Sequence, residues 1–105
     1  MNWFSANILF VSQHSLGISN QRIWEEKIFI FRAECDSHAL DVARQIGIRN
    51  QLEYEVSEFD RVKWVFDRVE RVCEIQGNII VDGVEVFSRF LKDSEVISLL
   101  TPFDD

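Results

Sequence analysis

The N-terminal third of the chain alternates apolar and polar positions in a pattern that predicts two β-strands. The first, over residues 3–11, has one fully apolar face, made of Phe4, Ala6, Ile8 and Phe10. Its other face is mixed because Ser5 and Asn7 interrupt it. The second strand, over residues 23–33, contains a run that is apolar on both faces. Such a run is typical of a strand covered on both sides, so we expect this strand to be central in the sheet.

A helix is expected next, over residues 37–46. Asp36 suits its N-cap, because a carboxylate accepts hydrogen bonds from first-turn amides and faces the positive end of the helix dipole. Apolar residues then recur at helical spacing as one narrow stripe, namely Ala39, Leu40, Ala43 and Ile46. This stripe must face the sheet. Gly47 fits the left-handed position that commonly ends a helix.

Residues 52–56 and 62–66 alternate apolar and charged positions, which predicts an antiparallel hairpin. Closing it with a loop over residues 57–61 places Tyr54 opposite Trp64. A slip of one residue would move both aromatic rings into water, so we expect a firm register.

The apolar alternation changes phase after Phe66, and a β-bulge near Asp67 and Arg68 would restore it. Asp82-Gly83 then predicts a tight hairpin leading into a last strand over residues 84–91.

Asp93 or Ser94 can cap a short final helix that ends before Pro102. The order strand-strand-helix-strand-strand-strand predicts a single α+β domain over residues 1–105. We expect an antiparallel sheet of four to six strands, with one main helix packed on one face and the short helix at the C-terminus.

Four segments resemble a family of bacterial proteins called domain of unknown function 4288. They are W-F-S-A-N-I-L-F, E-E-K-I-F-I-F-R-A-E, V-K-W-V-F and D-G-V-E-V-F-S-R-F, in the family's order and over most of residues 3–91. The loop over residues 12–22 and the helix after Asp93 depart from the family pattern. The resemblance implies a compact bacterial α+β domain and no particular activity.

Composition narrows the class of protein further. The chain has 105 residues, 47% of them hydrophobic, which excludes disorder. A net charge of -7 argues against nucleic-acid binding, since phosphate contacts need clustered Lys and Arg. The sequence contains no apolar run long enough to predict a membrane span. Cys35 and Cys73 lie far apart, and the N-terminus lacks a basic leader, so we expect reduced thiols and a cytoplasmic protein. A disulfide between the two cysteines is the alternative, since both could end neighbouring strands.

Catalytic chemistry has little support in the sequence. Ser5 and Ser88 lie outside any G-x-S-x-G turn, and no glycine-rich loop could cradle a phosphate. His38 and Asp41 share a helical face, but two ligands seldom hold zinc. His14 is expected to be an ordinary surface histidine. We therefore expect no enzyme, no catalytic residue, no metal and no cofactor.

Two groups of residues are candidates for binding. The first is an acidic hairpin, made of Glu53, Glu55, Glu58 and Asp60. It is interpreted either as a solvated edge that resists aggregation or as a docking patch for a basic partner. The second is a possible polar network or pocket, made of Ser5, Asn7, Glu26, Glu85, Ser88 and Arg89. In it Arg89 could pair with Glu26 or with Glu85, because buried polar groups need partners.

The leading functional hypothesis is a non-enzymatic module that binds a protein, either itself or another. An immunity-type neutraliser of a basic toxin enzyme, acting through the acidic hairpin, is the alternative. A small hydrolase built on Ser5 or Ser88 is the least favoured. The two apolar faces of the first strands favour a homodimer, because a monomer would expose a large apolar patch. The rival solution is a sheet curled into a half-barrel around its own aromatic rings.

Overall fold

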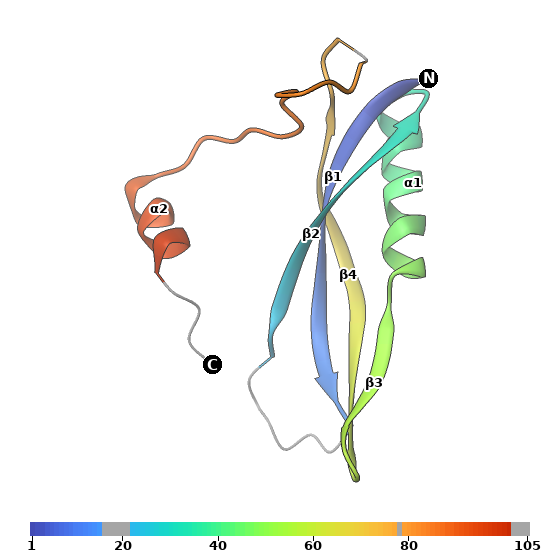
Figure 1. Ribbon diagram of the computed structural model, residues 1–105, viewed down its shortest axis with the longest axis vertical. Coiled ribbons are helices and arrows are strands. Elements are labelled where there is room, and N and C mark those ends of the chain that lie inside the picture. Colours follow the sequence, from blue (N-terminus) through green and yellow to red (C-terminus); the bar gives the residue numbers. More distant parts are fainter. Residues whose placement is uncertain (16–21, 78, 102–105) are drawn as a thin grey trace.

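In the computed structural model, four antiparallel strands form one curled sheet in the order β2-β1-β4-β3 (Figure 1). The structure describes residues 1–15, 22–77 and 79–101. Its elements are β1 (Asn2–His14), β2 (Trp24–Ala33), α1 (Asp36–Arg49), β3 (Leu52–Ser57), β4 (Asp60–Glu74) and α2 (Asp93–Leu100). The predicted α+β class, its main helix and its short C-terminal helix are confirmed.

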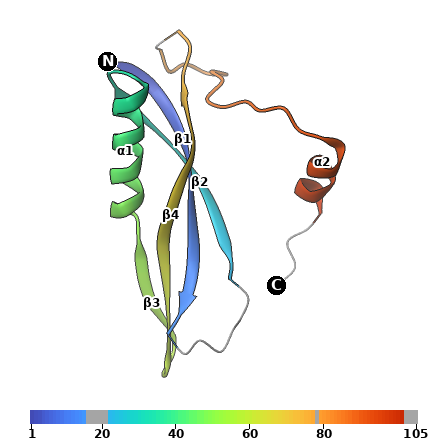
Figure 2. The same cartoon turned by 180° about the vertical axis from the view of Figure 1, so that it is seen from behind.

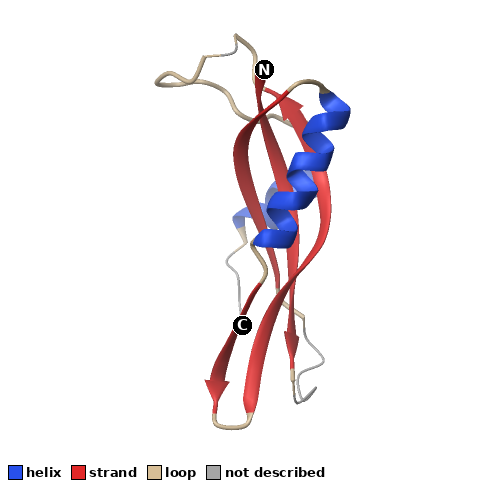
Figure 3. Ribbon diagram, turned by 90° about the vertical axis from the view of Figure 1, so that its right-hand side faces the viewer, coloured by secondary structure: helices blue, strands red, loops and turns tan. Residues whose placement is uncertain are grey.

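The hydrophobic core lies between α1 and one face of the sheet, here called the inner face (Figure 3). The predicted apolar face of β1 supplies its centre, since Phe4, Ala6, Ile8 and Phe10 are at most 1% exposed. Two aromatic pairs extend this centre to the neighbouring strands, with Phe4 stacked on Phe31 and Phe10 edge-on to Phe66. The opposite side of the sheet is called the outer face.

The expectation that the second strand is central is wrong. β2 is an edge strand, paired with β1 alone, and β1 and β4 occupy the centre of the sheet. Its inner-face residue Phe31 is buried, whereas its outer-face residues Ile28 and Ile30 are 49% and 45% exposed. α1 packs against the inner face only. The apolar residues on the outer face of β2 therefore remain exposed to solvent.

Both ends of α1 differ from the expectation. The N-cap is Cys35, and Asp36 is already the first helical residue. Gly47 lies inside the helix, which continues to Arg49 and is capped by Asn50. Glycine is required here for close packing, because a Cβ atom on Gly47 would lie 2.4 Å from the ring of Phe66.

The β3–β4 hairpin is tighter than predicted. Ser57 pairs with Asp60, so the loop 57–61 is replaced by a two-residue turn and Tyr54 lies opposite Val62. The predicted Tyr54–Trp64 pairing is therefore wrong by two residues. Because the shift is even, both rings remain on one face, and Trp64 Nε1 donates to Tyr54 Oη at 3.2 Å.

The predicted bulge in β4 is present, and a second one accompanies it. Phe10 pairs with Phe66 and Leu9 with Arg68, which leaves Asp67 as an extra residue. A further irregularity makes Glu70 extra as well. The two bulges keep Phe66, Val69 and Val72, which are three residues apart, on the inner face.

The predicted last strand, over residues 84–91, is not formed, and this is a further correction. Val84 N donates to the Val81 carbonyl at 3.1 Å around the Asp82-Gly83 turn, but no strand pairing flanks the turn. Residues 79–101, here called the C-terminal arm, leave the sheet instead and run out on the side opposite α1 (Figure 1).

The helix α2 lies at the far end of the arm. Among the described residues it contacts none of the strands and not α1 (Figures 1 and 2). Lys92 is its N-cap, and the Lys92 amide donates to Glu95 Oε1 at 2.9 Å. The expected stop at Pro102 falls outside the described residues. The radius of gyration is 16.6 Å, against about 13 Å for a compact domain of this length.

In the described part of the chain, neither helix has the length and apolar character needed to cross a membrane.

Candidate functional site

The outer face of the central strands carries buried polar side chains. Ser5 is 0% and Asn7 1% exposed, and both lie on the face of β1 that turns away from α1. The register places Ser5 beside Cys73 and Asn7 beside Arg71 of β4. A polar side chain buried this completely has to find hydrogen-bond partners on neighbouring elements.

The first partner is the C-terminal arm. Ser5 Oγ donates to the carbonyl oxygen of Val86, and Arg71 Nη1 donates to the carbonyl oxygen of Ser88 at 3.3 Å. These two contacts hold residues 86–89, here called the arm root, across the outer face of the sheet. Beyond the arm root the chain departs from the sheet.

The second partner of this face is a pair of carboxyl groups. Asn7 Nδ2 donates to Glu26 Oε2 at 3.2 Å, and this hydrogen bond lowers the pKa of Glu26. Glu70 is hydrogen-bonded to Glu26, which raises the pKa of Glu70. The two acidic side chains therefore interact with each other, and the interaction shifts their pKa values in opposite directions.

The bulge explains why Glu70 reaches this cluster. Consecutive residues of a regular strand point to opposite faces, and Arg71 faces outward beside Asn7. The extra residue in β4 breaks this alternation, so Glu70 and Arg71 both reach partners on the outer face.

Two arginines complete the cluster. The guanidinium carbons of Arg71 and Arg89 lie 5.3 Å and 5.8 Å from the centre of the Phe87 ring. Together with Ser88 and Phe90 they line a pocket of about 430 Å³ on the outer face. We call the set made of Asn7, Glu26, Glu70, Arg71, Phe87 and Arg89 the outer-face cluster.

Five of the six residues of the predicted polar network come together here, namely Ser5, Asn7, Glu26, Ser88 and Arg89. Arg89 lies near Glu26 and Glu70, and exposed Glu85 takes no part. Sequence reasoning missed Glu70, Arg71 and Phe87. The phase change in β4 was the one signal that could have pointed to the first two.

The acidic hairpin lies at the opposite end of the sheet from the arm root. Arg61 donates to Glu53 Oε1 at 3.0 Å and to Glu55 Oε1 at 3.1 Å, so one guanidinium partly neutralises two of its carboxylates. Glu58 lies exposed in the two-residue turn. Asp60 is turned toward β1.

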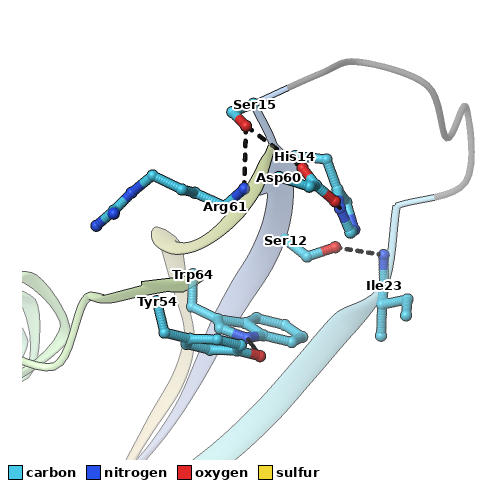
Figure 4. A network of polar contacts seen from close by, with 8 residues as sticks. All are labelled: Ser12, His14, Ser15, Ile23, Tyr54, Asp60, Arg61 and Trp64. Carbon is cyan, nitrogen blue, oxygen red and sulfur yellow. Dashed lines mark hydrogen bonds and ion pairs between the residues drawn. The ribbon is translucent and has the colours of Figure 1, made fainter. Parts of the chain in front are cut away.

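Asp60 joins the ends of β1 and β4 (Figure 4). His14 Nδ1 lies 3.0 Å from Asp60 Oδ2, and Ser15 Oγ donates to Asp60 Oδ1 at 3.3 Å. Ser15 also accepts a hydrogen bond from the Arg61 amide at 3.0 Å. The carboxylate thus separates the serine from the histidine, and a nucleophilic serine needs the histidine as its direct partner.

The other residues considered for catalysis are engaged in local structure. Ser5 is bound to the arm root, and His38 Nδ1 accepts a hydrogen bond from the Glu34 amide at 3.0 Å. Within the described residues, no serine is hydrogen-bonded to a histidine, and no three potential metal ligands gather. Cys35 and Cys73 are both free thiols.

Comparison with known proteins places the chain in a family. The family model described as "Domain of unknown function (DUF4288)" matches residues 3–88. The chain belongs to this family. The match ends inside the arm root, so the family region contains the sheet and α1, and α2 lies beyond it.

A more distant similarity links the chain to a curated enzyme. It is 29% identical over 76 residues to a protein named chorismate mutase from Methanocaldococcus jannaschii. This alignment covers 70% of the chain and 71% of the relative. No solved structure matches the chain.

Proposed function

We propose that the protein is a non-enzymatic interaction module that binds a second copy of itself, with α2 of each copy packed on the outer face of the other. The observation that carries this proposal is the isolation of α2, which contacts no other described helix or strand. Its exposed apolar residues are Val96, Ile97, Leu99 and Leu100. A helix of eight residues is not stable in water by itself, so it needs an apolar surface to pack on.

The outer face of β2 supplies a matching surface. Trp24, Ile28 and Ile30 are 42%, 49% and 45% exposed, and they lie on one side of an edge strand. Fully burying an exposed side chain of this size is worth about 1.5–3 kcal/mol, so each of these half-exposed side chains would contribute about half of that to a complex. An apolar strand face and an apolar helix are therefore exposed on the same chain.

The charges of the two surfaces are complementary. The first turn of α2 carries Asp93 and Glu95, and its last turn has no basic residue. The outer face carries three arginines, Arg32, Arg68 and Arg71, opposite Trp3, Leu9 and Asn7 of β1, and these outnumber its two acids, Glu26 and Glu70. Opposite charges of this kind orient an incoming helix and speed its association.

A second copy of the chain would cover both exposed apolar surfaces, the helix α2 and the outer face of β2, at the same time. The arm root holds the arm on its own sheet, while α2 stands clear of that sheet (Figures 1 and 2). If each arm reaches across to the other copy, two identical contacts form around a twofold axis and the assembly closes. This is a homodimer built by exchange of α2.

The test is the mass in solution across a range of concentrations, measured by light scattering coupled to size exclusion. We expect twice the chain mass of 12.4 kDa for the natural sequence. Ile28→Glu and Ile97→Glu should each weaken the dimer about ten- to a hundredfold, since each places a charge in the apolar contact. Ile48→Glu is the matched control, because Ile48 is equally exposed on α1 and should leave the dimer intact.

Two results would overturn this proposal. A mass of 12.4 kDa at every concentration would mean that α2 folds back on its own sheet or serves a different partner. A dimer that survives both Ile28→Glu and Ile97→Glu would have its interface elsewhere.

A second candidate function is enzymatic, and the similarity to a chorismate mutase is the observation that favours it. The test is to incubate the protein with chorismate and to measure whether chorismate is consumed. Turnover that Arg89→Gln abolishes would make the outer-face cluster an active site and displace the interaction module as the main function.

A further inference from the structure

The outer-face cluster presents two arginines at a pocket of small-molecule size. The pocket measures about 430 Å³ and is lined by Arg71, Ser88, Arg89 and Phe90. Pockets that bind small organic ligands are typically about 300–1,000 Å³ and combine apolar walls with a few fixed polar groups.

The ring of Phe87 supports both guanidinium groups. Arg71 lies 5.3 Å and Arg89 5.8 Å from its centre, each within the range of a cation–π interaction. Contact with a ring face uses none of the N–H donors of a guanidinium. The aromatic ring therefore supports the two cations and leaves their hydrogen-bonding edges available.

The neighbouring carboxyl groups do not occupy those edges. Glu26 accepts a hydrogen bond from Asn7, and Glu70 interacts with Glu26. Arg71 donates one hydrogen bond, to the Ser88 carbonyl, and Arg89 donates none to the described residues. Each guanidinium has five N–H donors, so most of them remain unused here.

The cluster combines two cationic and two acidic side chains. Arg71 and Arg89 are the cations, and Glu26 and Glu70 are the acids. In addition, Asn7 Oδ1 is buried without a hydrogen-bond partner among the described residues. A polar network that only stabilises the fold would pair each buried polar atom with a hydrogen-bond partner inside the protein.

We propose that Arg71 and Arg89 form a binding site for the carboxylate of a small organic acid with an aromatic or apolar body. A carboxylate is planar and accepts two parallel N–H bonds from one guanidinium. Phe90 is fully exposed at the same pocket and offers a surface for the body of the ligand. The acidic pair beside the arginines disfavours a more highly charged anion such as phosphate. All of these groups belong to one chain, so the site does not depend on dimer formation.

The experiment titrates the full chain with benzoate and measures the backbone amide chemical shifts by NMR. We expect saturable shifts at Arg71, Ser88 and Arg89. Benzamide, which has the same ring without the charge, should cause none. Arg89→Gln should weaken benzoate binding at least tenfold. Arg32→Gln is the matched control, since Arg32 also stacks on a ring, that of Trp3 at 4.7 Å, but does not line the pocket.

Arg89→Gln is preferred over a change at Arg71, because Arg71 also holds the arm root. An unchanged spectrum away from the pocket shows that the variant is folded. The proposal is overturned if benzoate gives no saturable shift at tens of millimolar, or if benzamide binds equally well. It also fails if inorganic phosphate binds as tightly as benzoate, or if Arg32→Gln weakens binding as much as Arg89→Gln.

Discussion

The carboxyl group of Glu26 raises the pKa of Glu70 on the outer face of the sheet, although the two residues lie 44 positions apart on β2 and β4. β1 lies between these two strands, and its Asn7 donates to the same Glu26 carboxylate. These side-chain interactions link three strands. The bulge in β4 makes them possible because it brings Glu70 to the outer face.

The first prediction concerns this acid pair. Glu26→Gln should lower the pKa of Glu70 toward its ordinary value of 4.5, because the neighbouring negative charge that raises it is gone. The measurement is a pH titration of the Glu70 side-chain carboxyl by carbon NMR. Glu25→Gln, one residue away on β2, is the control and should leave the Glu70 pKa unchanged.

The same pair sets opposite pH dependences of folding stability. The raised pKa of Glu70 stabilises the fold below about pH 4.5, and this contribution is lost as pH rises through the folded-state value. The lowered pKa of Glu26 stabilises the fold above about pH 4.5, and this contribution is lost as pH falls. A Glu70 pKa that stays raised in Glu26→Gln would contradict the assignment.

The second prediction concerns the thiols. The pKa of Cys35 is lowered, first by the hydroxyl of Ser37 and then by the first-turn amide of His38, since both favour the thiolate. Cys35 should therefore react faster than Cys73 with a maleimide near neutral pH. Mass spectrometry of peptides from a brief labelling gives the ratio. Ser37→Ala should slow Cys35 without affecting Cys73, and equal rates in the natural chain would contradict the prediction.

The third prediction concerns the contact between α1 and β4. Gly47→Ala should destabilise the fold, because the added Cβ would lie 2.4 Å from the Phe66 ring. Overpacking costs about 1–3 kcal/mol, which outweighs the gain of about 0.5–1 kcal/mol from replacing glycine in a helix. Thermal unfolding followed by circular dichroism measures the difference.

A double-mutant cycle separates the contact from helix propensity. In a Phe66→Leu background the smaller side chain leaves room for the methyl group, so Gly47→Ala should cost much less there. An equal loss in both backgrounds would show that the Phe66 ring is not responsible.

The fourth prediction concerns the arm root. Ser5→Ala removes the hydroxyl that donates to the Val86 carbonyl, so amide hydrogens of residues 84–89 should exchange faster with deuterium. Ser12→Ala is the matched control, since Ser12 is also a buried serine of β1, but its hydroxyl accepts from the Ile23 amide at 3.0 Å. Exchange at the arm that is unaltered by Ser5→Ala would mean that other contacts hold the arm root.

Local periodicity in the sequence determined much of this fold. Alternation alone identified the inner face of β1, and helical spacing identified the stripe of α1. The phase change after Phe66 indicated a bulge at the correct position. Ser5 and Asn7 were recognised because polar residues interrupt an otherwise apolar strand; Asn7 lies in the outer-face cluster, and Ser5 binds the arm root.

The tertiary structure alone decided how these elements are combined. β2 has apolar residues on both faces, yet the strand order places it at the edge, and alternation within a strand carries no information about its neighbours. The observed register of the β3–β4 hairpin differs from the predicted one by two residues. Periodicity cannot detect this difference, because an even shift keeps every side chain on the same face. The second bulge, at Glu70, and the course of the arm depend on contacts between residues far apart in the chain. Such contacts form only after the chain has folded and brought distant residues together. Local sequence patterns do not encode them, so the outer-face cluster could be predicted only in part.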